Sequence, residues 1–386
     1  MANNNENKVL NVPHLRFPEF SGEWEKNNLS KFSSKITKKN KSNFINNVLC
    51  NSANLGIIPQ NDYFDRDIAN ADNTDSYYII EQGDFVYNPR KSTAAPYGPV
   101  NIYNGEKPGI ISPLYLCFSV FNISPSFLFY RFKSSVWHPY VYSHGDTGVR
   151  YDRVSIKDDV FFDMPIYTPT QNEQEKIATL LSLIDERIAT QNKIIEDLKK
   201  LKSAISKKLL CNDKWTTYKI QDIAEIGRGR VISSVEIDRQ RHPLYPVYSS
   251  QTSNDGIMGY LDEYMFDGEY ITWTTDGANA GTVFYRKGMF NCTNVCGTLK
   301  ILPKFDCYFV SLVLQQATQK YVSSNLANPK LMNNTMASIK IKIPDIEAQK
   351  QLSKIFQTLD SCLLVHQRTC FMYSREKQYL LCQMFI

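Results

Sequence analysis

Two stretches of the chain carry the same hydrophobic pattern at one fixed offset, the offset that separates Ile177 from Leu352. Alternating steps of four and three residues trace a stripe in each stretch, and eight of the ten positions in the first stripe are apolar. Such heptad stripes are typical of a coiled-coil seam, so two long helices are predicted. The first stripe is Ile177, Leu181, Ile184, Ile188, Gln191, Ile195, Leu198, Lys202, Ile205 and Leu209. The second is Leu352, Phe356, Leu359, Leu363, His366, Cys370, Tyr373, Lys377, Leu380 and Met384.

A proline stands before each stripe, at Pro169 and Pro344. Proline is tolerated in the first turn of a helix but not inside it, so these residues predict the two helix starts. The polar interruptions fall at matching steps, and we hypothesise that the central pair, Gln191 and His366, sets the register of one coiled coil. The alternative is two unrelated amphipathic helices, each lying on its own domain.

Each helix follows a segment of short aromatic and β-branched runs separated by turn residues, which predicts a mixed α/β domain with long loops. Trp24 and Trp215 open the two segments, with apolar residues five and eight positions later in both. The predicted fold class is α/β (α+β), a pseudo-two-fold tandem repeat whose long helices pair antiparallel. Its parts are a first domain at 1–168, a helix at 169–210, a second domain at 211–343 and a helix at 344–386. A further helix is expected near 308–321.

Composition limits the classes of partner and the cellular compartment that suit this chain. The net charge is only +5, which argues against indiscriminate coating of a polyanion but allows local basic patches. Nine cysteines without paired C-x-x-C spacing favour a reducing cytoplasm. The polar start of the chain predicts no signal peptide, and no run approaches the roughly 20 apolar residues of a membrane span.

Several loops hold the side-chain types that read base edges and grip phosphates, interleaved with aromatic residues. A solvated turn explains any single member better than a DNA contact does, but the set as a whole favours DNA binding. The candidates in the first domain are Lys38, Lys39, Arg90, Lys91, Ser92, Tyr97, Ser143, His144, Arg150 and Tyr151. Those in the second are Arg228, Arg230, Ser250, Gln251, Thr252, Asn254, Trp273, Thr275, Asn328 and Lys330.

The sequence lacks the motifs of self-contained catalysis. It has no P-loop, no Gly-rich strand-to-helix turn suited to an adenosyl cofactor, and no pair of histidines at metal-ligand spacing. The stretch 276–281 is Gly-rich but leads into a strand-like run, so a turn or a DNA-facing loop explains it better. We therefore expect no catalytic residue, no metal and no cofactor in this chain.

Three motifs resemble those of the specificity subunit of type I restriction-modification enzymes. They are R-F-P-E-F-S-G-E-W at 16–24, P-T-x-x-E-Q-x-K-I-A at 169–178 and the reprise P-x-x-x-x-Q at 344–349. The domain–helix–domain–helix layout is similar too, although Ala348 stands where glutamate is usual. The resemblance implies two target recognition domains, each reading half of a split double-stranded DNA site, on a helical spacer that docks two modification subunits. It further implies S-adenosylmethionine in those subunits, and ATP and Mg²⁺ in separate restriction subunits.

Two other interpretations remain open from sequence alone. A tandem adaptor or carbohydrate-binding protein would also carry tyrosine and tryptophan loops and a low net charge. A self-contained nuclease or methyltransferase would need a site assembled only in space. If the chain does bind DNA, the sequence predicts a bipartite, asymmetric target whose unread gap changes when one heptad is deleted from a helix.

Overall fold

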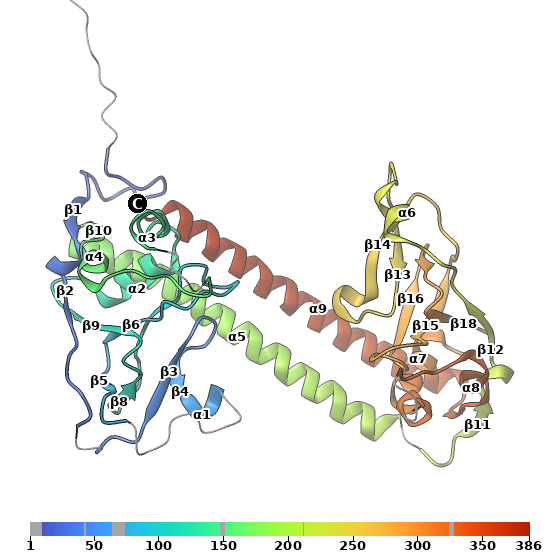
Figure 1. Cartoon of the computed structure of the whole chain (residues 1–386). Helices are drawn as coiled ribbons and strands as arrows, with labels where there is room; N and C mark the ends of the chain where they lie inside the picture. Colours follow the sequence, from blue (N-terminus) through green and yellow to red (C-terminus); the bar gives the residue numbers. More distant parts are fainter. Residues whose placement is uncertain (1–9, 42–43, 64–73, 147–150, 211, 324–327) are drawn as a thin grey trace, which may run out of the picture. The chain divides into compact units, whose positions relative to one another are not determined.

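The computed structural model describes residues 10–41, 44–63, 74–146, 151–210, 212–323 and 328–386 (Figure 1). The chain forms two compact units. One consists of Met1–Gln191 with Arg368–Ile386, and the other of Asn192–Gln367. Two long helices, α5 (Gln171–Leu209) and α9 (Ile346–Gln383), each contribute one part to either unit. Both helices start two residues after the proline that predicted them, so the predicted mixed α/β fold with two long helices is confirmed.

The described residues of the first unit form three sheets. Strands β1 (Glu25–Asn28) and β10 (Pro165–Thr168) pair antiparallel. A second sheet has the order β2 (Ser33–Lys35), β9 (Leu116–Val120), β6 (Phe85–Tyr87) and β7 (Val100–Ile102). A third has the order β4 (Gly56–Pro59), β3 (Val48–Ser52), β8 (Gly109–Ile111) and β5 (Tyr78–Ile80). The short helices are η1 (Leu29–Lys31), α1 (Gln60–Tyr63), α2 (Pro125–Lys133), α3 (His138–His144) and α4 (Asp158–Phe162).

The second unit repeats this plan. Strands β11 (Thr216–Lys219) and β19 (Lys340–Ile343) pair antiparallel. A four-stranded sheet has the order β12 (Ala224–Arg228), β18 (Cys296–Ile301), β15 (Glu269–Thr274) and β16 (Val283–Lys287). A three-stranded sheet has the order β14 (Ile257–Leu261), β13 (Tyr245–Tyr248) and β17 (Asn291–Cys292). The helices are η3 (Ile220–Asp222), α6 (Ser234–Asp238), η4 (Ser253–Gly256), α7 (Cys307–Ala317), η5 (Thr318–Tyr321) and α8 (Asn333–Ser338).

The two units share strand order, except that β5 has no counterpart among the described strands of the second unit. In the sheets that contain β6 and β15, every described pairing is antiparallel. In the neighbouring sheets, β3 and β13 each make one hairpin and one parallel pairing, with β8 and β17 respectively. Helix α2 packs on β7, and α7 packs on β15 and β16. The predicted helix near 308–321 is confirmed as α7 followed by η5.

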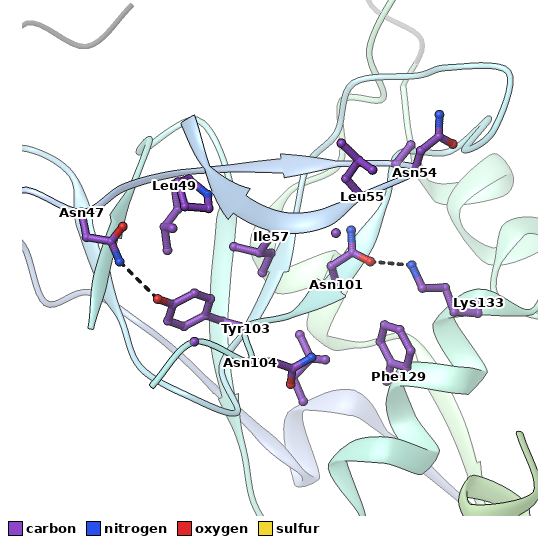
Figure 2. Close-up of a pocket in the computed structure, with 15 residues that line it drawn as sticks. Asn47, Leu49, Asn54, Leu55, Ile57, Asn101, Tyr103, Asn104, Phe129 and Lys133 are labelled. Carbon is purple, nitrogen blue, oxygen red and sulfur yellow. Dashed lines mark hydrogen bonds between the residues drawn. The ribbon is translucent and has the colours of Figure 1, made fainter. Parts of the chain in front are cut away.

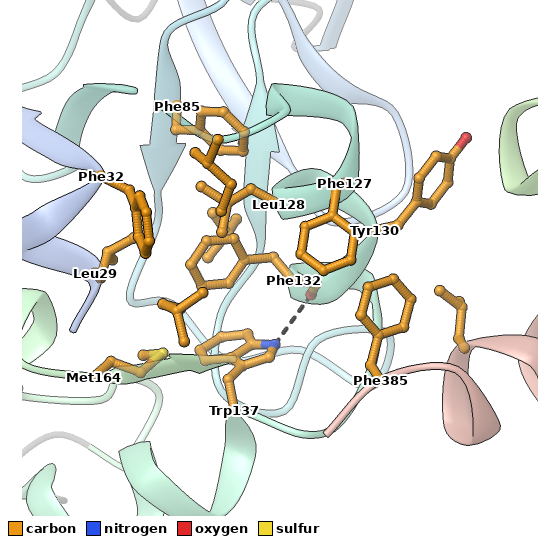
Figure 3. Packing of buried hydrophobic residues seen from close by; sticks show 14 of the residues in the cluster. Leu29, Phe32, Phe85, Phe127, Leu128, Tyr130, Phe132, Trp137, Met164 and Phe385 are labelled. Atoms are coloured by element: carbon orange, nitrogen blue, oxygen red, sulfur yellow. Dashed lines mark hydrogen bonds between the residues drawn. The ribbon is translucent and has the colours of Figure 1, made fainter. Parts of the chain in front are cut away.

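Aromatic side chains fill the core of the first unit (Figure 3). The Tyr87 and Phe161 rings stack at 4.8 Å, and the Trp137 indole donates to the Phe132 carbonyl at 3.1 Å. Phe385, just beyond α9, places its ring 5.4 Å from that of Phe127 in α2. The end of the second long helix is thus anchored in the hydrophobic core of the first unit.

Candidate nucleic-acid interface

Both predicted stripes are the inward faces of their helices. Every one of their twenty positions is buried or half-buried, and the intervening positions are mostly exposed. Ile177, Leu181 and Ile184 join Leu380 and Met384 in the core of the first unit. In the second unit, Phe356 is fully buried, and Ile205, Leu352 and Leu359 pack against that core. The heptad pattern therefore identified the buried face of each helix.

Two aspartates connect the long helices to each other and to their domains. Asp185 of α5 accepts from the Tyr130 hydroxyl at 2.9 Å and from the Lys377 ammonium at 2.5 Å. In the second unit, Asp360 of α9 accepts from the Tyr308 hydroxyl at 2.6 Å and pairs with Lys202. Burial first, and then the adjacent carboxylate, raise the pKa of each tyrosine, so both hydroxyls remain donors.

These ion pairs define one antiparallel register. Asp185 pairs with Lys377, and Lys202 pairs with Asp360. Lys202 follows Asp185 along α5, whereas its partner precedes Lys377 along α9 by the same number of residues. The helix segments in each unit therefore contact one another, as the antiparallel prediction requires. These contacts do not test the hypothesis that Gln191 and His366 set the register, which stays a prediction.

The repeated glutamines bind the N-terminal ends of two shorter helices, α2 and α7. Gln174 accepts from the backbone N–H of Ser124, the N-cap of α2, and donates to the Pro169 carbonyl. Gln349 accepts from the N–H of Asp306, the N-cap of α7, and donates to the Pro344 carbonyl. The proline and glutamine of each repeat therefore form the same hydrogen-bonded arrangement, which joins a long helix to its domain.

The motif at 16–24 folds against the start of α5. Arg16 donates to both carboxylate oxygens of the fully buried Glu173, through Nε at 2.8 Å and Nη2 at 2.7 Å. The Trp24 indole donates to the same carboxylate at 3.3 Å, and hydrogen bonding to Glu173 raises the pKa of Arg16. The second repeat has Ala348 at the position equivalent to Glu173, so the departure from the expected motif coincides with the loss of this carboxylate.

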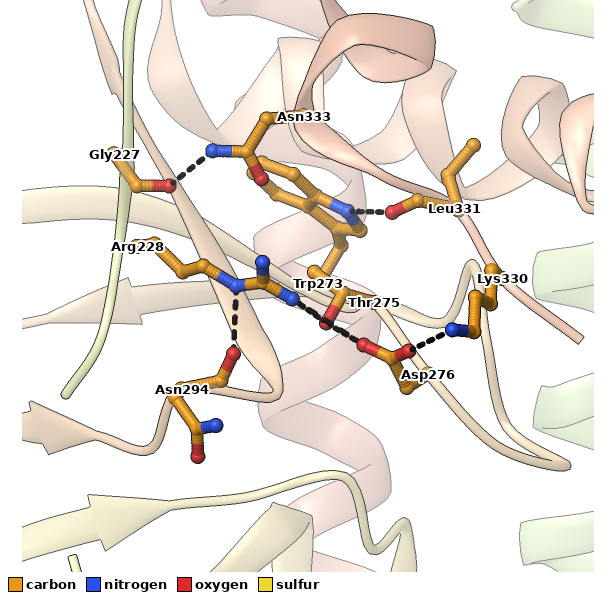
Figure 4. A network of polar contacts seen from close by, with 9 residues as sticks. All are labelled: Gly227, Arg228, Trp273, Thr275, Asp276, Asn294, Lys330, Leu331 and Asn333. Carbon is orange, nitrogen blue, oxygen red and sulfur yellow. Dashed lines mark hydrogen bonds and ion pairs between the residues drawn. The ribbon is translucent and has the colours of Figure 1, made fainter. Parts of the chain in front are cut away.

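In the second unit, three candidate residues meet around Asp276, which follows β15 (Figure 4). The Asp276 carboxylate accepts from the Thr275 hydroxyl at 2.7 Å and from Arg228 Nη2 at 3.3 Å, and it lies 3.6 Å from the Lys330 ammonium. Arg228 also donates through Nε to the Asn294 carbonyl at 2.6 Å. Two cations held around one partly exposed carboxylate can offer donors and an acceptor to base edges or phosphates.

Two tightly packed glycines shape this region. A Cβ on Gly229, between Arg228 and Arg230, would lie 2.1 Å from the Cys292 carbonyl oxygen. A Cβ on Gly297 would lie 2.2 Å from the Trp273 ring. Glycine at 229 therefore allows the backbone at Cys292 to lie close, and glycine at 297 leaves room for the Trp273 ring.

Two predicted contacts in this unit need correction. Trp273 is fully buried, because its place in β15 points the indole into the core, where it donates to the Leu331 carbonyl at 2.9 Å. Thr275 is also fully buried; it holds Arg228 and Asp276 in place and is not open to a ligand.

The contacts described for the other second-unit candidates are with residues outside the Asp276 cluster. Arg230 pairs with Glu236, whose hydrogen bond raises the pKa of the guanidinium. Gln251 donates to the Ile257 carbonyl, and Asn254 adopts a left-handed backbone with φ of 50°. The Ser250 carbonyl accepts from Asn279, while Thr252 and Asn328 are exposed.

In the first unit, the loop after β6 carries the corresponding charged cluster. Arg90 is largely exposed, and its Nε lies 4.0 Å from Asp152, which also lies 3.9 Å from the Nε of Arg153. The Lys91 N–H donates to the Asp152 carbonyl at 2.8 Å, and Arg90 and Arg153 form a β-bridge. Asp152 and Arg153 were not among the residues predicted from the sequence, although they directly follow the candidate Tyr151.

The remaining first-unit candidates differ in exposure. Tyr151 and Ser92 are exposed, whereas Tyr97 is half-buried, with its ring 4.8 Å from that of His138. His144 stacks on Tyr140 at 4.1 Å and contacts the Ser143 hydroxyl at 2.8 Å. Lys38 lies 3.7 Å from Glu81, and Lys39 forms a β-bridge with Tyr78. Arg150 lies outside the described residues.

Neither a metal site nor a membrane helix occurs in the described part of the chain. Those residues include no cluster of three or more His, Cys, Asp or Glu side chains placed to hold a metal ion. They also include no helix with the length and apolar character needed to cross a membrane.

Comparisons with known proteins agree with this architecture. Residues 212–369 match the family model of the type I restriction modification DNA specificity domain. A Mycoplasma pneumoniae protein named as type I specificity subunit S.MpnORF201P is 40% identical over 196 residues, which cover 50% of this chain and 82% of that protein. The type I restriction enzyme MpnII specificity subunit of the same organism is 43% identical over 145 residues, covering 37% of this chain and 43% of that protein.

Two solved structures share the fold. One is the crystal structure of a type I restriction-modification S subunit from M. genitalium, with a TM-score of 0.66 and 17% identity, covering 97% of this chain and 99% of that one. The other comes from a study of complex assembly and conformational transition in a type I system, with a TM-score of 0.56 and 12% identity, covering 94% and 97%. This chain belongs to the family of type I restriction-modification specificity subunits, which confirms the resemblance seen in its motifs.

Proposed function

We propose that this specificity subunit reads a bipartite, asymmetric DNA site, with one half-site bound by each unit. The observation that carries the proposal is the repeated strand order together with a charged cluster in the loop after the matching strand. That strand is β6 in the first unit and β15 in the second, and the clusters are those of Arg90 and Asp276. The clusters differ in residue type and partners, so the two half-sites are expected to differ in sequence.

The long helices are proposed to act as the spacer between the two readers. At about 1.5 Å per residue, a helix of the length of α5 extends about 58 Å, which exceeds the ~34 Å between half-sites one DNA turn apart. The Lys–Asp–Tyr bridges support this role because they oppose sliding of one helix along the other. The helices are also the proposed docking surface for two modification subunits.

Catalysis is assigned to the partners under this proposal. The modification subunits would bind S-adenosylmethionine and methylate adenine, and restriction subunits would use ATP and Mg²⁺. The role of this chain is to place both activities on one DNA sequence.

Mapping methylated adenines in DNA from cells that carry this subunit and its partners tests the proposal. The expected result is a split motif with two unlike halves and a gap of fixed length. Methylation at one continuous motif would overturn the bipartite proposal. An Arg90→Ala change should then relax only one half of the motif, and an Arg228→Ala change only the other.

A further inference from the structure

A cavity of about 590 Å³ opens in the first unit beside the hairpin of β3 and β4 (Figure 2). Strand β7 and the C-terminal end of α2 form its other walls, through Asn101, Phe129 and Lys133. The described residues that line it include neither Arg90 nor another predicted DNA contact. Its volume lies in the range of sites that enclose small organic ligands.

Lys133 is the single charged side chain among the described residues that line this cavity. Its ammonium donates to Asn101 Oδ1 at 2.5 Å and lies 4.9 Å from the centre of the Phe129 ring. No carboxylate forms an ion pair with it in the described part of the chain. Burial, with a smaller effect of Lys377, lowers the pKa of Lys133 to about 8, against an opposing effect of Asp185. The Lys133 side chain is half-buried. A cation that loses part of its hydration without a countercharge is costly, and an anion entering the cavity would offset that cost.

Buried asparagines hold the ammonium in place. Asn101 is 2% exposed and donates to Asn51 Oδ1 at 2.6 Å and to the Ser52 carbonyl at 3.0 Å. The Asn51 carbonyl accepts from the Asn88 amide, which in turn accepts from the Arg90 N–H. The side-chain oxygen of Asn101 is thus fixed toward Lys133, and the remaining ammonium protons are available to a ligand.

The rest of the lining suits a flat organic group. Leu49, Leu55, Ile57 and Phe129 provide apolar walls. Asn54 and Asn104 are exposed at separate places on the rim, so that one of these amides can meet the polar edge of a ring (Figure 2). The donor and acceptor of a single amide match the edge of adenine, and an aromatic face stacks on any base.

The second unit shows that the fold does not require this lysine. Its corresponding helix, α7, packs on the same kind of sheet and has no basic residue in its last turn. Lys133 therefore marks a property of the first unit alone.

We propose that this cavity binds a nucleotide, with its phosphate on Lys133 and its base against Phe129 and one of the two rim amides, that of Asn54 or that of Asn104. A free nucleoside monophosphate and a nucleotide of bound DNA share this chemistry. The two sources are separable by experiment, and only the DNA source rests on the function proposed above.

Binding of AMP to the full-length chain, measured by calorimetry beside adenosine and inorganic phosphate, tests the proposal. The variants are Lys133→Met and Phe129→Leu, and Lys107→Met is the control because that exposed lysine lies outside the cavity lining. Thermal unfolding establishes that each variant is folded. A free-nucleotide site predicts AMP binding that Lys133→Met weakens about tenfold or more and Lys107→Met leaves unchanged.

A parallel measurement of duplex DNA binding, with the modification subunits present, tests whether the cavity takes a nucleotide of bound DNA. A DNA-nucleotide site predicts no AMP binding, but weaker DNA binding in Lys133→Met and Phe129→Leu and not in Lys107→Met. If folded Lys133→Met and Phe129→Leu match the unchanged chain in both assays, the proposal is wrong.

Discussion

Asp185 and Asp360, at equivalent positions of the two long helices, accept the same two kinds of donor in different units. Each takes a hydrogen bond from a tyrosine of its own domain and an ion pair from a lysine of the other long helix. Tyr130 lies six residues after the N-cap of α2, whereas Tyr308 lies two residues after that of α7. The two domains therefore supply the same hydrogen bond from positions that differ by about one helical turn.

Replacing Asp185 by Asn should lower the free energy of unfolding by about 1–2 kcal/mol. The change removes a partly exposed ion pair and turns a charged acceptor of the tyrosine hydroxyl into a neutral one. Chemical denaturation measures the loss. Asp197→Asn, at an exposed position of the same helix, is the control and should change stability by less than about 0.5 kcal/mol. Equal effects of the two variants would mean that the bridge contributes nothing.

The long helices were predictable because their signals are local and repeated. Proline fixes each start, and a heptad stripe fixes each buried face. The pairing partners of Asp185 and Asp360 were not predictable, because Tyr130 and Tyr308 do not share a sequence position relative to their caps. Tertiary packing selects such contacts, and one sequence does not display it.

The DNA-contact candidates were only partly predictable for a related reason. Arg228, Thr275 and Lys330 come from three separate segments, and sequence identified them by residue type without showing that they meet at Asp276. Trp273 misled because it lies in a part of β15 where both faces of the strand are buried, although its residue type also suits a DNA-facing loop. The Lys133 cavity was missed because its polar members are scattered over the residues that flank β3, over β7 and the loop after it, and over α2.

Removing the Arg16 side chain should destabilise the first unit by about 3–5 kcal/mol, because the buried Glu173 carboxyl would lose its ion-pair partner. Denaturant unfolding of Arg16→Ala measures the loss. Adding Glu173→Gln should recover part of it, because the amide still accepts from Trp24 without a charge. As a control, Lys176→Ala removes a half-exposed ion pair with Glu19 and should cost less than about 1 kcal/mol. A loss from Arg16→Ala no larger than that of the control would contradict the buried-pair account.

Arg228→Ala should weaken DNA binding by about 1–3 kcal/mol if the guanidinium contacts a base. Competition binding with duplexes altered in one half-site measures where the loss arises. Discrimination should fall at one half-site only, and Arg90→Ala should affect the opposite half. Arg239→Ala provides a matched charge loss at an exposed position of the second unit. A uniform loss at all sequences would indicate a phosphate contact instead.

The stability of the chain should depend on pH through Lys133. Its folded pKa is lowered to about 8 from 10.5, so between these values the unfolded chain holds a proton that the folded chain has released. Stability contributed by this group therefore rises as pH increases through that window, and below about pH 8 the cost of the buried charge is fully present. The unfolding free energy of the unchanged chain minus that of Lys133→Met should increase from pH 7 to pH 10. A difference that stays constant would show that Lys133 keeps its ordinary pKa.

Removal of one matched heptad from each long helix tests the spacer most directly. The register of the two ion pairs selects residues 192–198 of α5 and 364–370 of α9. Loss of one heptad shortens the pair by about 10 Å, or about three base pairs of DNA. Mapping of methylated adenines should then recover both original half-sites around a gap shortened by about that amount. Retention of the original gap by an active, folded variant would contradict the claim that these helices set the spacing.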